Sequence, residues 1–289
     1  MSLSKMRFTQ RQIGLATSLC SRQYSTSQAL PSRWFADLQA QLKELSTNQY
    51  PKECTEQAQK LNDFANENWL ELLAGQQGFL TDKKWRGIDN HQLLWGDMYG
   101  EQSSKDSSAT QLNSSGYVCV CSSVNSVSHL IGHVNNIMYN KYAETGRVKF
   151  IHNQSEDATE EEKPQWLDLP TPRGLGLILR SITTEYKFPL EFPDRISVFY
   201  KLLEAPTYES TSLKKEAWIL SETHRRLAAK CIEDTAIYDY RIAKKSVLKP
   251  FMVEKFQKTF KLQQERQKKY TEEANKLIKA VEELKTKYQ

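Results

Sequence analysis

The residues best suited to chemistry are crowded into one stretch, from Gly132 to Arg147. His133 carries an imidazole, which can take up or release a proton near neutral pH. It is followed by Asn135 and Asn136, and asparagine is a favoured N-cap residue of helices. The N–H groups of a first helical turn lack partners and carry positive partial charge. A carbonyl oxygen placed against this turn would therefore be polarised beside a candidate base.

The same side chains have structural alternatives. His133 could serve only to cap the helix, and the two asparagines could orient the turn without touching a ligand. Further along, Glu144 and Arg147 stand three residues apart, a spacing at which opposite charges pair on a helix surface. The residues alone leave these alternatives open.

The element that must position these groups is a buried helix from Asn135 to about Ile151. Apolar residues recur at steps of three and four, as one buried stripe requires. These residues are Met138, Tyr139, Tyr142, Ala143 and Phe150.

Strand-like segments surround this helix in the sequence. A first strand is expected at His91–Trp95, and β-branched or alternating segments follow the helix. They are Gly176–Tyr186, Ile196–Leu203, Lys215–Thr223 and Cys231–Lys244. One helix followed by several long strands predicts an α+β fold in which a curled antiparallel sheet wraps the helix.

Helices are predicted at both ends of this domain. Residues 32–45 and 55–74 read as two helices separated by Pro51, with apolar faces that need the outside of the sheet or a neighbouring subunit. From Phe251 to Gln289 one charged helix repeats apolar residues in a four-three alternation. That pattern fits a coiled-coil seam with another chain, or a helix folded back on its own domain.

Composition narrows the class of protein. At 289 residues and 39% hydrophobic content, the chain can bury one good-sized core, and it has no apolar run long enough for a membrane span. The net charge is +5, but residues 1–24 hold four basic residues and no acid, so the remainder is nearly neutral. Without a basic patch interleaved with aromatics, the sequence argues against nucleic-acid binding.

The N-terminal residues have the composition of a targeting sequence. Residues 1–24 contain Arg and Ser and can form a short amphipathic helix, which predicts a mitochondrial presequence cut after Tyr24. The odd count of five cysteines fits free thiols in a reducing matrix.

No cofactor or metal is predicted. Cys119, Cys121, His129 and His133 superficially resemble metal ligands, but Gly132 interrupts any helix that would align the two histidines. The sequence also lacks a phosphate-binding glycine loop and a serine nucleophile elbow.

The central stretch resembles a known family. Gly132-His133-Val134-Asn135-Asn136, then Tyr139, then Tyr142-x-Glu144-x-x-Arg147, is similar to the signature that opens the central helix of hotdog-fold acyl thioesterases of the 4-hydroxybenzoyl-CoA thioesterase type. Leu93–Met98 resembles the first strand of that family and Pro189–Val198 its second strand pair. The resemblance covers roughly residues 85–250 and is nearest to fungal mitochondrial thioesterase-like proteins.

The resemblance implies a hotdog fold and hydrolysis of an acyl-CoA or acyl-carrier-protein thioester in the mitochondrial matrix. It implies His133 as the base, assisted by Asp97, while backbone N–H groups near Gly132 and Val134 polarise the thioester carbonyl. Glu144 is kept as a third catalytic candidate because some hotdog enzymes place a working carboxylate on this helix. The implied substrate-binding residues are Gly132, Val134, Asn135, Asn136 and Tyr139. A homodimer or dimer of dimers is expected, with the acyl tunnel along the subunit interface.

The chain departs from the family at one place. There, an Asp-x-Asp-x-x-Gly-His turn joins the first strand to the helix, and its second Asp is the base or nucleophile. Here Asp97 matches the first, structural Asp, the second is missing, and about thirty residues separate Met98 from Gly132. The intervening segment is either a serine-rich surface loop that supplies a carboxylate such as Asp106, or a retained intron.

These observations predict four regions: a presequence (1–24), a helical extension (25–84), a hotdog thioesterase-like domain (85–250, with 99–131 as a low-complexity insertion) and a charged helix (251–289). The alternative function is a catalytically inactive hotdog scaffold of a mitochondrial assembly. The missing second Asp and the long C-terminal helix favour that alternative.

Overall fold

The structure is a computed structural model that describes residues 30, 33–47, 49–98 and 132–288. The sheet and the helices described below lie within Phe35–Gln289, apart from Trp34, the first residue of α1. The predicted presequence and the segment 99–131, with Asp106, lie outside the described residues.

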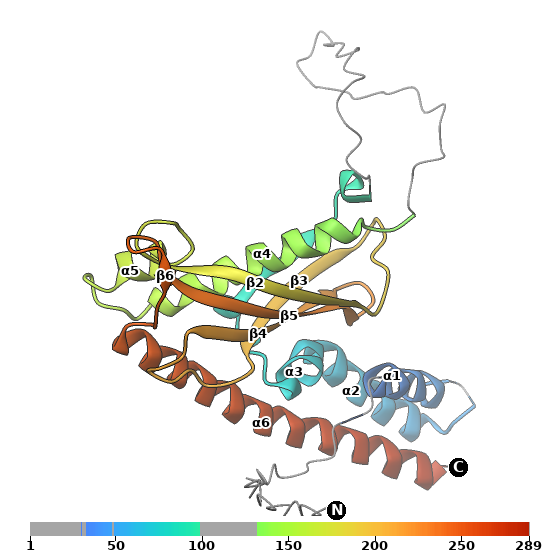
Figure 1. Ribbon diagram of the computed structural model, residues 1–289. Helices are drawn as coiled ribbons and strands as arrows, with labels where there is room; N and C mark the ends of the chain where they lie inside the picture. The colour runs from blue at the N-terminus through green and yellow to red at the C-terminus, as the bar shows by residue number, and fades with distance from the viewer. Residues whose placement is uncertain (1–29, 31–32, 48, 99–131, 289) are drawn as a thin grey trace, which may run out of the picture. The chain divides into compact units, whose positions relative to one another are not determined.

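Within the described part of the chain, the strands form a six-stranded sheet in the order β1-β3-β4-β5-β2, with β6 pairing beside β5 (Figure 1). Every pairing is antiparallel. The strands are β1 (Arg86–Gln92), β2 (Leu175–Tyr186), β3 (Arg195–Leu202), β4 (Ser212–Ser221), β5 (Arg226–Asp239) and β6 (Lys244–Lys245). The predicted α+β fold is thus confirmed, and β2 lies at one edge of the sheet.

The central helix α4 (Asn136–His152) lies against one face of this sheet (Figure 1). As predicted, Asn135 is the N-cap: its backbone is extended and its side-chain oxygen accepts a hydrogen bond from the N–H of Ile137 at 3.0 Å. The helix can approach β1 closely because two glycines meet there. A Cβ atom on Gly87 would lie 2.4 Å from the Cα of Gly146, so neither position has room for a larger residue.

A buried charge network ties α4 to three strands. Arg147 reaches Glu233 of β5 at 2.9 Å and Glu144 only at 3.8 Å, so the expected pair on the helix surface is the weaker contact. Glu233 is fully buried and also lies 2.6 Å from the hydroxyl of Tyr200. Lys215 of β4, equally buried, donates to Thr235 at 2.8 Å. Burial lowers the pKa of Lys215 to about 8.

The terminal helices lie on the side of the sheet opposite α4 (Figure 1). These are α1 (Trp34–Leu45), α2 (Lys52–Glu67), α3 (Trp69–Leu73), the 3₁₀ turn η1 (Gly75–Gln77) and α6 (Pro250–Tyr288). Of these, α6 contacts β3 directly. Phe79, just after η1, packs on Trp218 of β4 with ring centroids 4.9 Å apart. Lys201 of β3 donates to the carbonyl of Gln77 at 2.6 Å. The helical extension therefore contacts the outside of its own sheet, one of the two predicted partners.

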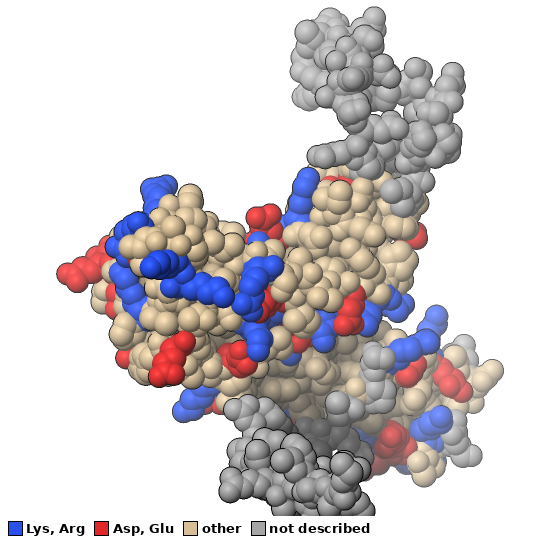
Figure 2. Space-filling view, viewed as in Figure 1, with Lys and Arg blue, Asp and Glu red and all other residues tan. Residues whose placement is uncertain are grey.

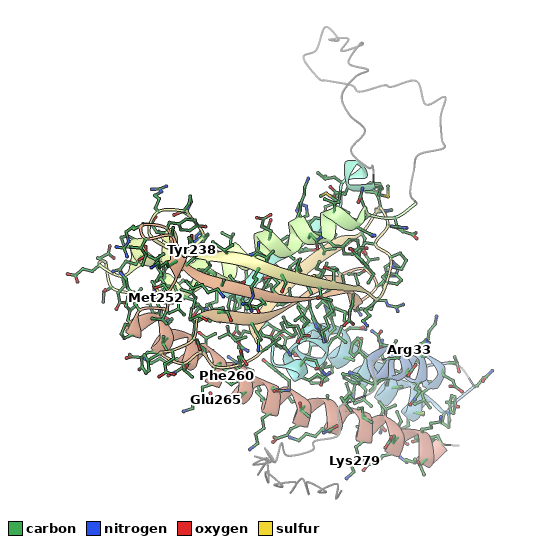
Figure 3. All side chains as sticks on the ribbon, viewed as in Figure 1. Arg33, Tyr238, Met252, Phe260, Glu265 and Lys279 are labelled. Carbon is green, nitrogen blue, oxygen red and sulfur yellow. The ribbon has the colours of Figure 1, made fainter. Side chains whose placement is uncertain are left out.

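The helix α6 packs on its own chain. The side-chain amide of Gln263 forms two hydrogen bonds with the backbone of Leu202. It accepts from the N–H and donates to the carbonyl, each at 3.1 Å. Figure 3 places Met252 and Phe260 along the part of α6 that runs beside the sheet. The predicted seam is buried here at Phe256, Tyr270, Ala274, Leu277, Val281 and Leu284. Of the two alternatives for this helix, the structure has the one that folds back.

Three local predictions were wrong. The helix predicted over 55–74 is two helices, broken at Asn68, whose φ of −108° and ψ of 22° leave the helical region. The first strand ends at Gln92, because residues Trp95–Met98 form a 3₁₀ turn, η3. The last predicted strand begins earlier, at Arg226, and ends at Asp239.

Short elements that the sequence analysis did not predict complete the fold. They are η2 (Lys83–Trp85), η5 (Asn153–Ser155) and α5 (Lys163–Asp168). In the described part of the chain, no helix is both long and apolar enough to cross a membrane.

Candidate functional site

The N-terminus of α4 and Asp97 come together, although 37 residues separate Asp97 from Asn135 in the sequence. The backbone N–H of Asn135 donates to the carbonyl of Asp97 at 2.9 Å. The Asp97 carboxylate is buried, and its Oδ2 atom accepts from the N–H of Leu94 and from the hydroxyl of Tyr142, each at 2.9 Å. Oδ1 accepts no hydrogen bond from a described residue. The Asp97 carboxylate is therefore fixed in place at the N-terminus of α4, which we call the mouth of α4, and its Oδ1 atom is left without a described donor.

Tyr142 is the donor that holds this carboxylate. Burial, together with the hydrogen bond to Asp97, raises the pKa of Tyr142 well above its usual value. The phenol therefore stays protonated and donates throughout the neutral range. Tyr142 lies on the stripe that the sequence predicted as simple core, so this role was missed. A buried tyrosine hydroxyl usually has a polar partner, and that rule was the available signal.

His133 lies half-buried at the same mouth. Its Nδ1 atom is 3.0 Å from the carbonyl oxygen of Val134. Because a carbonyl oxygen can only accept, Nδ1 carries the proton in this contact, and a neutral imidazole then has its lone pair on Nε2. The geometry leaves Nε2 free to accept a proton, as the base role requires, while the Nδ1 contact also orders the turn.

The backbone donors differ from those expected. The N–H of Val134 donates to the carbonyl of Leu190 at 2.7 Å, and Val134 is fully buried, so it cannot polarise a substrate carbonyl. The N–H of Asn135 is used by Asp97. In the part of the chain that the structure describes, the N–H of Asn136 has no acceptor, and this exposed residue is the first of α4. Asn136 is therefore the donor best placed at the positive end of the helix.

Tyr139 and Gly132 have more limited roles. Tyr139 is 2% exposed, and its hydroxyl accepts from the N–H of Leu190 at 3.1 Å. Its ring stands edge-on to Tyr186 at 5.1 Å, so it packs in the core below the N-terminus of α4. Gly132 is exposed and has a φ of +43°, a backbone conformation that suits glycine.

Glu144 does not join this group. It follows Asn136 by eight residues on α4, which is about 12 Å along the helix axis. Its side chain is 67% exposed. The structure thus brings Asp97, His133 and Asn136 to one mouth and leaves Glu144 outside it.

A cavity of about 270 Å³ runs along the other half of α4, beside the edge strand β2. Glu144 and Arg147 form its polar end. Its apolar wall includes Val148, Ile151, Leu177 and Leu179. This cavity borders α4 and could accept part of a ligand.

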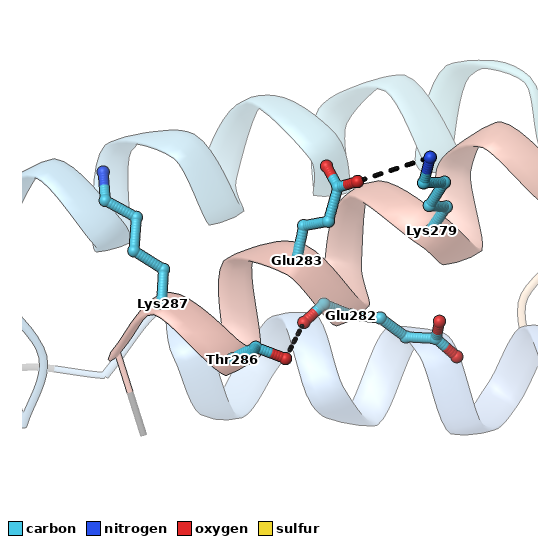
Figure 4. Close-up of a pocket in the computed structure, with 5 residues that line it drawn as sticks. All are labelled: Lys279, Glu282, Glu283, Thr286 and Lys287. Atoms are coloured by element: carbon cyan, nitrogen blue, oxygen red, sulfur yellow. Dashed lines mark hydrogen bonds and ion pairs between the residues drawn. The ribbon is translucent and has the colours of Figure 1, made fainter.

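A second hollow, of about 500 Å³, lies on the surface of α6 (Figure 4). Its side chains bond along the helix itself: Lys279 pairs with Glu283 at 3.6 Å, and Thr286 donates to the carbonyl of Glu282 at 2.9 Å. These are ordinary contacts of a solvated helix face, and we assign the hollow no role. Among the described residues, no group of three His, Cys, Asp or Glu side chains could hold a metal ion. Cys119, Cys121 and His129 lie outside them.

The thioesterase-like superfamily matches residues 121–256 of the chain. No curated protein matches. Solved structures similar to this one include a thioesterase from Thermus thermophilus complexed with coenzyme A and Zn, at 18% identity over 45% of this chain and 83% of that chain, with a TM-score of 0.35. Another is the DHNA-CoA thioesterase from Staphylococcus aureus, at 17% identity over 46% of this chain and 83% of that chain, with a TM-score of 0.37.

These TM-scores are low, so we identify the fold from the strand order and from the residues that match the superfamily. The strands form one antiparallel sheet with the central helix α4 against one face. Further helices precede and follow this unit in the sequence. The matched residues include α4 and five of the strands, β2 to β6. The chain therefore has a hotdog-like α+β fold, and residues 121–256 of it resemble the thioesterase-like superfamily.

Proposed function

We propose that the protein hydrolyses the thioester bond of an acyl-CoA. The observation that carries this proposal is the Asp97 carboxylate, which Tyr142 and the N–H of Leu94 hold at the N-terminus of α4. Water attack on a thioester carbonyl needs a base and a hydrogen-bond donor for the carbonyl oxygen. The carboxylate and the imidazole can act on the water, and the helical N–H of Asn136, which has no acceptor among the described residues, can donate to that oxygen. The thioesterase-like match supports the same reaction.

In the proposed reaction, the thioester oxygen accepts a hydrogen bond from the N–H of Asn136. A water molecule attacks the carbonyl carbon while its proton passes to Oδ1 of Asp97, and Nε2 of His133 accepts a hydrogen bond from the water's other hydrogen to orient it. The carbon–sulfur bond then breaks, the proton on Asp97 passes to the departing thiolate, and a carboxylic acid and a thiol are released. His133 thus orients the water, and Asp97 is the base.

The spacing of residues also supports Asp97 as the base. Asp97 is followed, after two residues, by Gly100, and His133 follows Gly132. Joined at these glycines, the chain would read Asp-x-x-Gly-His, the spacing of the second Asp in the family that the sequence resembles. The carboxylate that the sequence analysis counted as missing is then Asp97 itself.

Thiol release from a panel of acyl-CoAs of increasing chain length tests this function. For the full-length protein we expect saturable turnover on part of the panel. Asp97→Asn keeps the shape of the side chain but removes the base, and should lower kcat/KM about 10²- to 10³-fold. Asp89→Asn is the matched control, because Asp89 pairs with Arg86 at the surface. Absence of turnover on every chain length, or an Asp97→Asn variant as active as the control, would refute the proposal.

We also propose a homodimer formed through β2. This strand is twelve residues long, and β5 is its only partner among the described strands, so its other edge is left with unpaired backbone groups. Antiparallel pairing of two β2 strands would continue the sheet across both chains. Light scattering after size-exclusion chromatography should give the mass of two chains. The mass of one chain would contradict this arrangement.

The mitochondrial matrix remains a proposal based on residues 1–24, which lie outside the described residues. A fluorescent protein carrying this segment should enter mitochondria, and the same fusion with its four basic residues changed to glutamine should not. Cytosolic fluorescence of the first fusion would exclude the presequence.

The alternative function, a catalytically inactive scaffold, is now less well supported. It rested on a missing carboxylate and on a C-terminal helix free to bind partners. The Asp97 carboxylate at the mouth and the packing of α6 on its own chain weaken both arguments.

A further inference from the structure

We propose that Asn140 and Thr184 form a site for a hydroxyl group on the β-carbon of the acyl chain, so that β-hydroxyacyl-CoA is the preferred substrate class. This inference rests on the proposed function, because it names the acyl group whose thioester is hydrolysed. It concerns a pair of side chains, one on α4 and one on β2, that the proposed reaction does not use.

The two side chains come from elements that lie side by side. Thr184, near the end of β2, donates a hydrogen bond from its hydroxyl to the Oδ1 atom of Asn140 at 3.0 Å. Further along β2, the hydroxyl of Tyr186 lies 3.5 Å from the carbonyl oxygen of Asn136. The end of β2 is therefore fastened along the first two turns of α4, and the side chain of Asn140 is held in one orientation.

The pair has hydrogen-bonding capacity that the chain leaves unused. An amide side chain carries two N–H donors, and a hydroxyl carries one donor and two acceptor lone pairs. The Nδ2 group of Asn140 has no acceptor among the described residues. The Thr184 hydroxyl lies 3.6 Å from the Sγ atom of Cys231, and because its one hydrogen is given to Asn140, the thiol is the donor in that contact. One lone pair of the Thr184 hydroxyl therefore remains for a ligand.

The pair is also accessible and correctly placed. Asn140 is exposed and Thr184 is half-buried. Asn140 follows Asn136 by four residues, so the two lie on the same face of the helix about 6 Å apart along its axis. In the proposed reaction the thioester oxygen accepts from the N–H of Asn136. A substituent on the β-carbon, a few bonds from that oxygen, therefore reaches the turn that carries Asn140.

The chemistry of the pair favours a hydroxyl over other substituents. A hydroxyl can accept from Nδ2 of Asn140 and donate to Oγ1 of Thr184 at the same time, whereas a keto group can only accept. Figure 2 shows a mostly uncharged surface over the first turns of α4 and the adjoining end of β2. Glu185 and Lys187, beside this end of β2, pair with each other at 2.6 Å. The site therefore matches an uncharged group that both donates and accepts.

Ketone analogues of butyryl-CoA and β-hydroxybutyryl-CoA, in which a methylene group replaces the thioester sulfur, are the probes, because they keep the carbonyl and cannot be hydrolysed. Isothermal titration calorimetry with the full-length wild type should show one β-hydroxy enantiomer binding about threefold to tenfold more tightly than the butyryl analogue. Asn140→Leu should remove this preference without changing the affinity for the butyryl analogue, and Thr184→Val should reduce the preference. Asn275→Leu, at an exposed position of α6, is the matched control and should keep it.

The outcomes separate this inference from the hydrolase. Equal binding of the two analogues by the wild type, no binding of either, or a preference that survives in Asn140→Leu would overturn the hydroxyl site. Thiol release from butyryl-CoA would in each of these cases leave the hydrolase standing. A preference that is lost in Asn140→Leu and kept in Asn275→Leu supports the site, even if neither CoA ester is hydrolysed.

Discussion

At the scale of single residues, the hydrogen bond from Tyr142 orients the Asp97 carboxylate, which is the base of the proposed hydrolysis. We expect Tyr142→Phe to lower kcat about tenfold without a change in KM, because the phenol touches the carboxylate and not the proposed acyl group. Tyr270→Phe, which removes another buried phenol on α6, should leave both constants unchanged. A change in KM alone would show that Tyr142 shapes the binding site instead.

A second residue-scale prediction concerns Lys215. Its pKa is about 8 in the folded chain, against 10.5 for an unperturbed lysine. Between these values the unfolded chain binds a proton that the folded chain does not, so raising the pH through this window favours the folded state. The free energy of unfolding should rise by about 3 kcal/mol from this residue.

Urea unfolding at pH 7.5, 8.5 and 9.5 measures this rise. Lys215→Met should flatten it, whereas Lys214→Met, a change at a half-exposed neighbour on β4, should not. If both variants keep the full slope of the wild type, another group causes it.

These residues show where sequence reasoning stopped. The alternation of β5 placed Glu233 on the same strand face as Cys231 and Thr235, which was a usable sign that a charge faces the core. Its partners Arg147 and Lys215 come from other elements, so no local pattern could pair them. Asp97 was named as a candidate, but its closeness to Asn135 depends on a long-range contact that spacing did not predict.

At the scale of elements, periodicity was enough where one face of an element is buried. The central helix and the strands β2 to β4 begin and end within three residues of their predicted bounds. The sequence left the partner of α6 open, because a coiled-coil seam and a helix packed on its own domain bury the same positions. The structure resolves this through Gln263, a polar residue in the seam.

Gln263 therefore gives an element-scale prediction. Gln263→Leu leaves the N–H and carbonyl of Leu202 buried without partners and should lower the free energy of unfolding by about 2 to 4 kcal/mol. Gln264→Leu, at the exposed neighbouring position of α6, should change it by less than about 0.5 kcal/mol. Urea unfolding measures both. Equal stability of the two variants would mean that α6 does not depend on this clamp.

At the scale of the whole molecule, the contact between Asp97 and Asn135 determines how short the chain between them can be. Their backbone hydrogen bond of 2.9 Å closes a connection of 37 residues. Deleting residues 100–131 would leave five residues between the two, and a loop of five residues can still join groups that are in contact. The deletion also restores the sequence Asp-x-x-Gly-His.

We expect this deletion variant to fold and to be more stable by up to about 2 kcal/mol, because loop-closure entropy grows with the logarithm of loop length. Acyl-CoA hydrolysis should be kept or increased, since Asp97, His133 and Asn136 all remain. Urea unfolding and the thiol-release assay measure the two effects. A soluble variant that has lost activity would mean that the removed residues supply a catalytic group, as the Asp106 alternative holds. Retained activity with greater stability is what a retained intron at this junction predicts, because the fold and the mouth of α4 would then be complete without it.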